Sequence, residues 1–218
     1  MTFDRQGSTE DNLIDFTPEL RAEALDIVSR YTTGPLFTPP SIRVEEPDGN
    51  LGTIQLPGSQ GGADVQGAAF DPETNTLYVP SITSPFVADI VPGDPDGDLN
   101  YVLGGRQWIA GPRGLPLFKP PYGRITALDM NAGEILWQVP HGETPDNIRD
   151  HPRLQGVDIP RTGRVGRIGT LNTKTLVIAG EGGTFTTPSG ERGAMLRAYD
   201  KMTGAEVGAV YMPAAQSG

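Results

Sequence analysis

Three groups of charged residues in this sequence have side chains that could bind a metal, a proton or an anion. The first is the alternating series Asp94, Asp96 and Asp98 in PGDPDGDLN, which resembles the start of a calcium-binding loop. Gly105 stands where such a loop needs its bidentate glutamate, and Gly97 falls two positions too early. We therefore interpret this segment as a solvated acidic loop.

The second group contains the two histidines of the chain. His141 and His151 flank Asp146 and Asp150, an arrangement that would suit a pH-dependent site or a loose metal site. No third ligand with convincing spacing is visible in the sequence. The simpler interpretation is that both are histidines of surface loops.

The third group is a short basic run, Arg161, Arg164 and Arg167, placed just before an apolar segment. These guanidinium groups could attract an anionic substrate or the carboxylates of a cofactor. The alternative, which we favour, is that they pair with the many acidic neighbours. The nearby GEGG at 180–183 lacks the lysine and the strand–turn–helix context of a phosphate-binding loop, so nucleotide binding is not supported.

The composition excludes several classes of protein. A net charge of −10 with no basic stripe argues against binding to a nucleic-acid backbone. The absence of cysteine excludes disulfides and thiolate chemistry. No apolar run approaches the length of a membrane span, and the first residues are too polar for a signal peptide. With 29 glycines and 21 prolines the chain is rich in turns, as expected of an all-β protein with long loops.

One phrase recurs three times and predicts the elements that position these groups. Each copy is a strand, an aspartate that opens a five-residue turn closing on Gly or Asn, and a second strand. The aspartate can accept hydrogen bonds from backbone N–H groups just after it, and the last residue tolerates a positive φ. One such hairpin cannot bury its face alone, so repetition predicts stacked units, as in a propeller or solenoid, although three unrelated hairpins of a β-sandwich stay an alternative. The turns run from Asp71 to Asn75, Asp129 to Gly133 and Asp200 to Gly204.

Outside the repeats, the pattern predicts one helix, two strands and two long excursions. Thr17 can cap a helix that starts at Pro18 and runs for about a dozen residues, before the stop at Gly34 and Pro35. The excursions have little periodicity, and loops of such length are usually binding elements or lids. We expect strands at 52–56 and 176–180, an extended connector at 35–41, a long excursion between blades at 84–122 and a second excursion at 141–167.

Several segments together resemble the C-terminal blades of quinoprotein dehydrogenases, the enzymes that use pyrroloquinoline quinone (PQQ), and most closely the membrane-linked glucose/polyol dehydrogenase type. The opening stretch, 3–41, is similar to the helical insert of the glucose-type members. The resemblance covers nearly the whole chain. The segments that carry it are GGADVQGAAFDPETNTLYVPS (61–81), PYGRITALDMNAGEILWQVPHG (121–142), TKTLVIAGEGG (173–183) and LRAYDKMTGAEVG (196–208).

The resemblance implies an all-β, eight-bladed propeller with PQQ near its axis, held with Ca²⁺. It also implies a repeated tryptophan-docking phrase, in which a tryptophan buries its ring and donates its indole N–H to the neighbouring blade. The second copy of the repeat fits this phrase and ends on Trp137. The third has Gly208 where the tryptophan would dock, so we expect that contact to be lost.

Eight blades need several hundred residues, so the chain is expected to hold about three to four blades of roughly 40 to 50 residues each. The expected domains are a helical insert and connector at 1–40 and a partial propeller at 41–218, truncated at both ends. An open arc would expose apolar faces, so we expect a larger protein or a closing partner.

The resemblance places GGADVQG near the cofactor, where the family has Gly-Gly-x-Asn-Trp. Gly62, Asp64 and Val65 are the candidate cofactor-binding residues, with Asp64 in place of the asparagine and Val65 in place of the tryptophan. A carboxylate beside an anionic cofactor is unfavourable unless it is protonated or paired. For Gly62 a plain turn into a strand is an equal alternative. The family's catalytic base and Ca²⁺ ligands fall on no residue that we can match.

The implied activity is the oxidation of a sugar, polyol or alcohol hydroxyl, with electrons passed through PQQ to a quinone or cytochrome. The implied location is the periplasm, at the inner membrane through regions outside this chain. We expect the chain by itself to be inactive, because most ligands of the cofactor are absent. A non-catalytic propeller that serves as a binding or assembly scaffold stays an alternative, since a fold does not fix a function.

Overall fold

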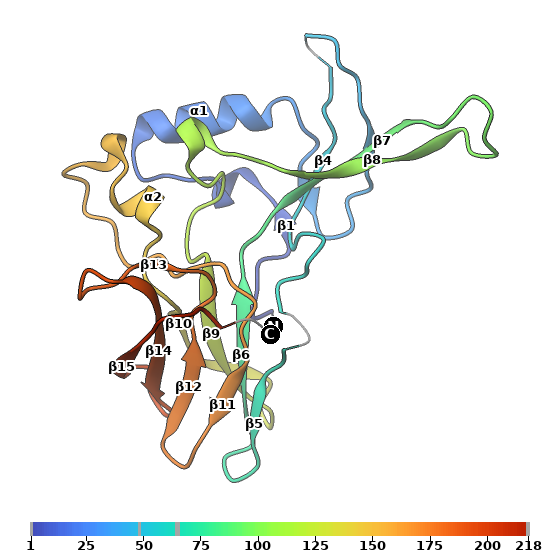
Figure 1. The fold of residues 1–218 in the computed structure, drawn as a ribbon. Coiled ribbons are helices and arrows are strands. Elements are labelled where there is room, and N and C mark those ends of the chain that lie inside the picture. The colour runs from blue at the N-terminus through green and yellow to red at the C-terminus, as the bar shows by residue number, and fades with distance from the viewer. Residues whose placement is uncertain (1, 48, 64–65, 217–218) are drawn as a thin grey trace. The chain divides into compact units, whose positions relative to one another are not determined.

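The computed structural model describes residues 2–47, 49–63 and 66–216, and these fold as two compact units (Figure 1). One unit, called here the blade unit, comprises Met1–Asp4, Gly62–Thr83 and Pro120–Gly218. The other, called the inserted unit, comprises Arg5–Gly61 and Ser84–Lys119. The expected division at residue 40 stays a prediction.

The first sheet of the blade unit combines two copies of the repeated phrase. Its four antiparallel strands lie in the order β10-β9-β6-β5, so the hairpins β5–β6 and β9–β10 are joined edge to edge through β6 and β9. Two copies of the phrase therefore build one blade-like sheet. The strands are β5 (Ala69–Asp71), β6 (Thr76–Ile82), β9 (Gly123–Asp129) and β10 (Glu134–Pro140).

The second sheet of the blade unit contains the third copy, as β14 and β15. Strand β14 pairs with β12, β13 and β15, and β11 pairs with β12. The predicted strand at 176–180 is confirmed as β12. Two short helices, α2 (Asp146–Arg149) and η3 (Pro152–Leu154), lie between the sheets in sequence. The strands are β11 (Thr170–Asn172), β12 (Leu176–Gly180), β13 (Phe185–Thr186), β14 (Arg192–Asp200) and β15 (Glu206–Met212).

The three aspartate turns form as the sequence predicts. The Oδ1 atom of each aspartate accepts a backbone N–H two residues on, at 3.1 Å for Asp71, 2.7 Å for Asp129 and 3.0 Å for Asp200. The closing residue of each turn has a positive φ, between 54° and 73°. The prediction of repeated hairpins is thus confirmed.

Trp137 joins the two sheets in the manner of the tryptophan-docking phrase. Its indole Nε1 donates to the carbonyl oxygen of Lys201 at 3.1 Å, and the hydroxyl of Tyr78 donates to the same oxygen at 3.3 Å. A Cβ atom on Gly204 would lie 2.7 Å from the indole ring, so a glycine is needed for this close packing. At Gly208, a Cβ would meet nothing within 4 Å, and no docking contact forms there.

A core of buried side chains lies between the two sheets. It draws residues from both sheets and from the segment just before β11. Apolar burial of this kind contributes about 25 cal/mol per Å² and is the main force that holds the sheets together. The residues are Tyr78, Ile125, Ala127, Trp137, Ile168, Val177, Ala179 and Tyr199.

The inserted unit contains the predicted helix, α1 (Pro18–Val28). The Oγ1 atom of Thr17 accepts the backbone N–H of Leu20 at 3.3 Å, which confirms the cap. Leu20, Ala24 and Val28 are buried, as a four-residue spacing on one face requires. The other elements are β1 (Gly7–Ser8), η1 (Glu10–Asn12), β2 (Gly34–Pro35), β3 (Ser41–Ile42), β4 (Thr53–Gln55), β7 (Phe86–Pro92), β8 (Tyr101–Trp108) and η2 (Pro112–Gly114).

The expectation of an irregular excursion between blades at 84–122 is wrong. Strands β7 and β8 form a long antiparallel hairpin there, and β3 and β4 pair with β7. The segment connects β6 to β9, which are neighbours in one sheet, so it is an insertion within a blade-like sheet. A bulge between Asp89 and Ile90, together with the glycines of β8, breaks the two-residue period that identifies strands.

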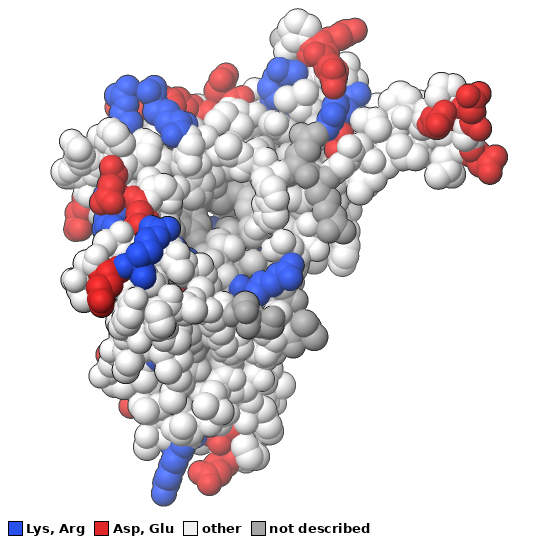
Figure 2. Space-filling view, viewed as in Figure 1, with Lys and Arg blue, Asp and Glu red and all other residues white. Residues whose placement is uncertain are grey.

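The tip of the β7–β8 hairpin carries the acidic series Asp94, Asp96 and Asp98. All three are exposed, and Figure 2 shows acidic side chains gathered at the end of this arm. The carboxylate of Asp94 accepts the backbone N–H of Asp96 at 3.0 Å, as in an ordinary Asx turn. Across residues 2–47, 49–63 and 66–216, no group of three or more His, Cys, Asp or Glu side chains is placed to hold a metal. The interpretation as a solvated acidic loop agrees with this exposure.

Candidate functional site

The loops that connect the strands of the blade unit gather at one end of its sheets. The aspartate turns close the opposite end, because each turn follows β5, β9 or β14 and precedes β6, β10 or β15. The segments that contain Gly62, His141, Arg161 and Glu181 therefore all leave the sheets at the connecting-loop end. Loops held on a rigid scaffold are where binding residues are usually found.

Gly62 lies at this end, since its carbonyl oxygen accepts the backbone N–H of Ile82 at 2.7 Å. A side chain at Gly62 would collide with the carboxylate of Asp4. That carboxylate forms a 3.0 Å ion pair with Arg124, and both side chains are buried. Glycine at this position thus has a structural reason, and its place beside a cofactor stays a prediction. The other two candidates, Asp64 and Val65, lie outside the described residues.

His141 is buried, which corrects the interpretation as a surface histidine. Its Nε2 lies 3.0 Å from the carbonyl oxygen of Gly180, so Nε2 carries the proton and donates. Its Nδ1 then accepts the hydroxyl of Tyr199 at 2.8 Å. Burial lowers the pKa of His141 to about 4 and raises the pKa of Tyr199, so both are neutral near pH 7. Both ring nitrogens are occupied, and His141 is not a metal ligand here.

His151 has a different and local role. Its Nδ1 accepts the backbone N–H of Arg153 at 3.2 Å and caps the short helix η3. The two histidines therefore serve separate parts of the connecting loop.

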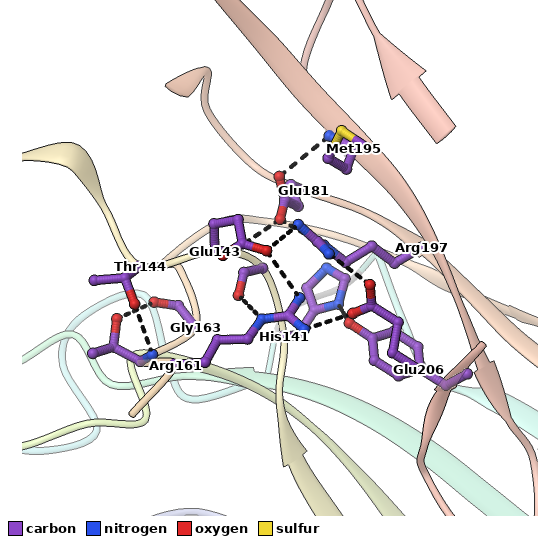
Figure 3. A network of polar contacts seen from close by, with 12 residues as sticks. His141, Glu143, Thr144, Arg161, Gly163, Glu181, Met195, Arg197 and Glu206 are labelled. Atoms are coloured by element: carbon purple, nitrogen blue, oxygen red, sulfur yellow. Dashed lines mark hydrogen bonds and ion pairs between the residues drawn. The ribbon is translucent and has the colours of Figure 1, made fainter. Parts of the chain in front are cut away.

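Beside His141, a buried arginine is surrounded by three glutamates (Figure 3). Arg197 donates from Nε to Glu181 at 2.8 Å, from Nη1 to Glu206 at 2.7 Å and from Nη2 to Glu143 at 2.9 Å. Burial alone would lower the pKa of Arg197, but the three carboxylates outweigh it and raise that pKa. Each nitrogen of this guanidinium donates to a carboxylate, so its charge is compensated within the network.

Glu181 is fully buried and connects the network to the backbone. Its Oε1 accepts the N–H of Glu143 at 2.8 Å, and its Oε2 accepts the N–H of Met195 at 3.2 Å. The loop that starts at Glu143 is thereby fixed to β14. Removing one partner of a buried ion pair usually lowers the free energy of unfolding by about 3 to 5 kcal/mol, because the other charge is left uncompensated.

Arg161 extends the network and confirms that this member of the basic run pairs with acidic neighbours. Its Nη1 donates to Glu206 at 2.6 Å, and its Nε donates to the carbonyl of Gly142 at 2.7 Å. Burial tends to raise the pKa of Glu206, but Arg161 and Arg197 outweigh it and lower the pKa. Glu206 is thus ionised and paired, and its contacts with the two arginines hold the surrounding segments in position.

Two pockets open on either side of Glu143 and Arg149. One has a volume of about 400 Å³ and the other about 320 Å³. The larger is lined partly by apolar side chains of the segment 154–159, and the smaller by Phe185 and its neighbours. Both pockets are large enough for a small molecule, and both lie at the connecting-loop end.

Sequence reasoning missed the glutamates of this network. A signal was present, because Arg197 and Tyr199 stand two residues apart in β14 and must share one face of the sheet. A charged residue on a core-facing position requires a buried partner. The partners Glu143, Glu181 and Glu206 come from three separate segments, and no spacing in the sequence connects them.

Comparisons with known proteins agree with this architecture. The family model described as "PQQ: Glucose/ethanol/alcohol dehydrogenase, beta-propeller domain" matches residues 1–218. The glycerol dehydrogenase large subunit of Gluconobacter thailandicus is 28% identical over 204 residues, covering 81% of this chain and 25% of the relative. Quinoprotein glucose dehydrogenase A of Acinetobacter calcoaceticus is 24% identical over 158 residues, covering 65% of this chain and 19% of the relative.

Among solved structures, the quinohemoprotein alcohol dehydrogenase of Comamonas testosteroni is 16% identical, with a TM-score of 0.43 over 85% of this chain and 26% of that chain. The chain spans about a quarter of the length of the curated glycerol dehydrogenase subunits that it matches. No helix in the described part of the chain is long and apolar enough to cross a membrane. The match along all 218 residues shows that this chain belongs to the PQQ-dependent glucose/ethanol/alcohol dehydrogenase β-propeller family.

Proposed function

We propose that this chain forms part of the eight-bladed propeller of a dehydrogenase that oxidises a hydroxyl group of a sugar, polyol or alcohol with PQQ. The family match over residues 1–218 carries this proposal. The named substrates of three relatives, glycerol, quinate and glucose, are all polyhydroxylated molecules. A polyol or sugar is therefore the proposed substrate class.

The proposed cofactor side is the connecting-loop end of the blade unit. We assign Gly62, Asp64 and Val65 to the segment that faces the cofactor, and we assign the Ca²⁺ ligands to regions outside this chain. One observation on this chain fits a cofactor that carries several carboxylates. The Nε and Nη2 atoms of Arg164 are buried and have no hydrogen-bond partner among the described residues.

When bound, PQQ supplies the two-electron acceptor for the alcohol, and a quinone or cytochrome is the proposed next acceptor. The Glu143–Arg197–Glu181 contacts hold the connecting loop in one position, because each ion pair also engages the backbone or β14. Preorganisation of this kind is what a site needs to place a substrate accurately. The proposed location is the periplasmic side of the inner membrane.

A reconstitution experiment tests the proposal. The protein as its host produces it is stripped of metal and cofactor, and Ca²⁺ and PQQ are then restored separately and together. We expect reduction of an artificial quinone with glycerol, glucose or quinate only when both are restored. Absence of PQQ-dependent reduction with all three substrates, together with no saturable change in PQQ absorbance, would refute the proposal and favour a non-catalytic propeller.

A further inference from the structure

Arg164 belongs to the basic run, and unlike Arg161 it forms no ion pair in the described part of the chain. It lies in the irregular segment 157–169, and its backbone N–H donates to the carbonyl of His141 at 2.8 Å. Its side chain is half-buried, and its Cζ lies 4.6 Å from the centroid of the Phe185 ring. The guanidinium therefore stacks on an aromatic face at the connecting-loop end.

Among the described residues, one of its three guanidinium nitrogens has a hydrogen-bond acceptor. Nη1 donates to the carbonyl of Thr184 at 3.4 Å, a long contact. The Nε and Nη2 atoms are buried and find no acceptor among the described residues. Burial lowers the pKa of Arg164, which reflects a charge that is shielded from water. Leaving buried donors unpaired carries a free-energy penalty, which is larger when the group is charged.

The two acidic residues that act most strongly on Arg164 are already committed to other partners. Glu181 accepts from Arg197 and from two backbone N–H groups. Asp146 pairs with Arg149 and Arg192 and also accepts from Thr186. Neither carboxylate is free to turn toward Arg164. No reorientation of these two acidic neighbours would therefore pair its Nε and Nη2 atoms.

Nε and Nη2 form the side of a guanidinium that carries two parallel N–H groups. This edge matches the two oxygens of a carboxylate, and such bidentate pairs are among the strongest hydrogen bonds in proteins. The cation–π contact with Phe185 holds the guanidinium over the aromatic ring. We propose that the Nε–Nη2 edge of Arg164 is the receptor for a carboxylate of a bound ligand, either the cofactor or an acidic substrate.

The edge is shielded in the ligand-free chain, so binding requires a local rearrangement. Segment 157–169, which carries Arg164, contains no helix or strand that would resist one. The inference that the cofactor supplies the carboxylate rests on the proposed function. The inference that an acidic substrate supplies it does not, and neither does the stability test below.

The first test uses stability without any ligand. Arg164→Met keeps a long apolar side chain on Phe185 and removes the unpaired charge. Replacing a poorly compensated buried charge by an apolar group is commonly stabilising, so we expect a higher melting temperature. Arg153→Met, at an exposed arginine of η3, is the matched control and should leave the melting temperature unchanged. A lower melting temperature for Arg164→Met would overturn the inference that the charge is unsatisfied.

The second test adds ligand probes to the protein as its host produces it. PQQ and quinate each carry carboxylates, and glycerol is the uncharged control. We expect at least one acidic probe to raise the melting temperature of the unchanged protein. Arg164→Met and Arg164→Lys should bind that probe about 10- to 100-fold more weakly, because lysine keeps the charge but lacks the paired donors. Arg153→Lys should bind it normally.

The pattern of losses identifies the source of the carboxylate. Loss confined to PQQ assigns the edge to the cofactor, and loss confined to quinate assigns it to the substrate. If quinate binding depends on Arg164 but the protein has no PQQ-dependent activity, the proposed function is refuted and the carboxylate site at Arg164 is supported. The site is refuted if neither probe binds, or if both bind equally well to the Arg164 variants.

Discussion

The indole nitrogen of Trp137 donates to the backbone carbonyl of Lys201, 64 residues further along the chain and in the other sheet of the blade unit. The same lysine places its ammonium group 2.5 Å from Asp71, and both side chains are buried. One residue of a turn thus receives a hydrogen bond through its backbone and forms an ion pair through its side chain. Together these contacts join the two sheets at the aspartate-turn end.

Trp137→Phe should weaken this joint while keeping an aromatic ring. Without the indole N–H, the buried carbonyl of Lys201 keeps only the hydroxyl of Tyr78 as a donor among the described residues. We therefore expect a loss of about 1 to 3 kcal/mol in the free energy of unfolding. Urea denaturation measures this loss. Leu136→Ala, at an exposed position on the same strand, is the control and should change the midpoint little. Equal midpoints for Trp137→Phe and the unchanged protein would contradict the assigned role.

Gly204 and Gly133 offer a matched pair, since both close an aspartate turn with φ near +70°. The Cβ of an alanine at Gly133 would meet no atom within 4 Å. Gly133→Ala should therefore lower the free energy of unfolding only through the strain of a left-handed backbone, by about 1 to 2 kcal/mol. Alanine at Gly204 must also displace the Trp137 ring, and overpacking of this kind costs about 1 to 3 kcal/mol more. Thermal unfolding of the two variants tests the difference. If both lose the same stability, the close packing on Trp137 is not important.

Arg197→Met should be strongly destabilising, by about 3 to 5 kcal/mol, because Glu181 would remain buried without its partner. The double variant Arg197→Met with Glu181→Gln removes that charge and should recover part of the loss. Chemical denaturation of both single variants and the double variant gives the coupling energy. Additive losses would show that the two side chains do not depend on each other.

His141 should make stability depend on pH in the mildly acidic range. Its pKa falls from 6.5 to about 4 in the folded chain, so the unfolded state binds the proton more readily. The neutral histidine therefore favours folding above pH 6.5, and this contribution is lost as the pH falls toward about 4, with a slope of up to about 1.4 kcal/mol per pH unit.

The measurement compares the free energy of unfolding of the unchanged protein and His141→Gln at several pH values. The variant should lose stability less steeply between pH 6.5 and 4. Arg153→Met, at an exposed arginine that does not titrate in this range, is the control and should keep the original slope. Parallel curves for the unchanged protein and His141→Gln would show that burial of this ring is not coupled to folding.

Asp71 should contribute to stability at a lower pH. The hydrogen bond from Lys201 is the main reason that the pKa of Asp71 is lowered to about 2. A lowered pKa means that the ionised carboxylate favours folding above pH 4 and that this support disappears as the pH falls toward 2. Asp71→Asn should flatten acid unfolding in that window, as monitored by tryptophan fluorescence. Asp96→Asn, at the exposed hairpin tip, is expected to unfold like the unchanged protein.

The sequence allowed the local features of the fold to be predicted, because each depends on neighbouring residues. Thr17 and Pro18 mark a helix start, and an aspartate four positions before a glycine or asparagine marks a hairpin. Trp137 was identified through the family phrase. By contrast, the assembly of two hairpins into one sheet depends on the pairing of β6 with β9, which are separated by the inserted unit. No local pattern reports such a pairing.

The candidate site was predicted less well for the same reason. The burial of His141 depends on Gly180 and Tyr199, which reach it from other strands. In the sequence, Arg164 is one of three arginines that look equivalent. In the structure, Arg161 pairs with Glu206, whereas two nitrogens of Arg164 have no hydrogen-bond partner among the described residues. Sequence spacing identified the charged segment, and only the folded arrangement distinguished its members.

The insertion of residues 84–119 between β6 and β9 has a consequence for the rate of folding. Ile82 pairs with Gly123 at the start of the β6–β9 ladder, so this pairing must wait until the intervening chain has been looped out. A tenfold longer loop adds only about 2 kcal/mol of closure entropy, which a stable sheet can tolerate. Contacts between residues so distant in sequence are nevertheless slow to form. The two hairpins should therefore appear early, and their union into one sheet should be the slow step.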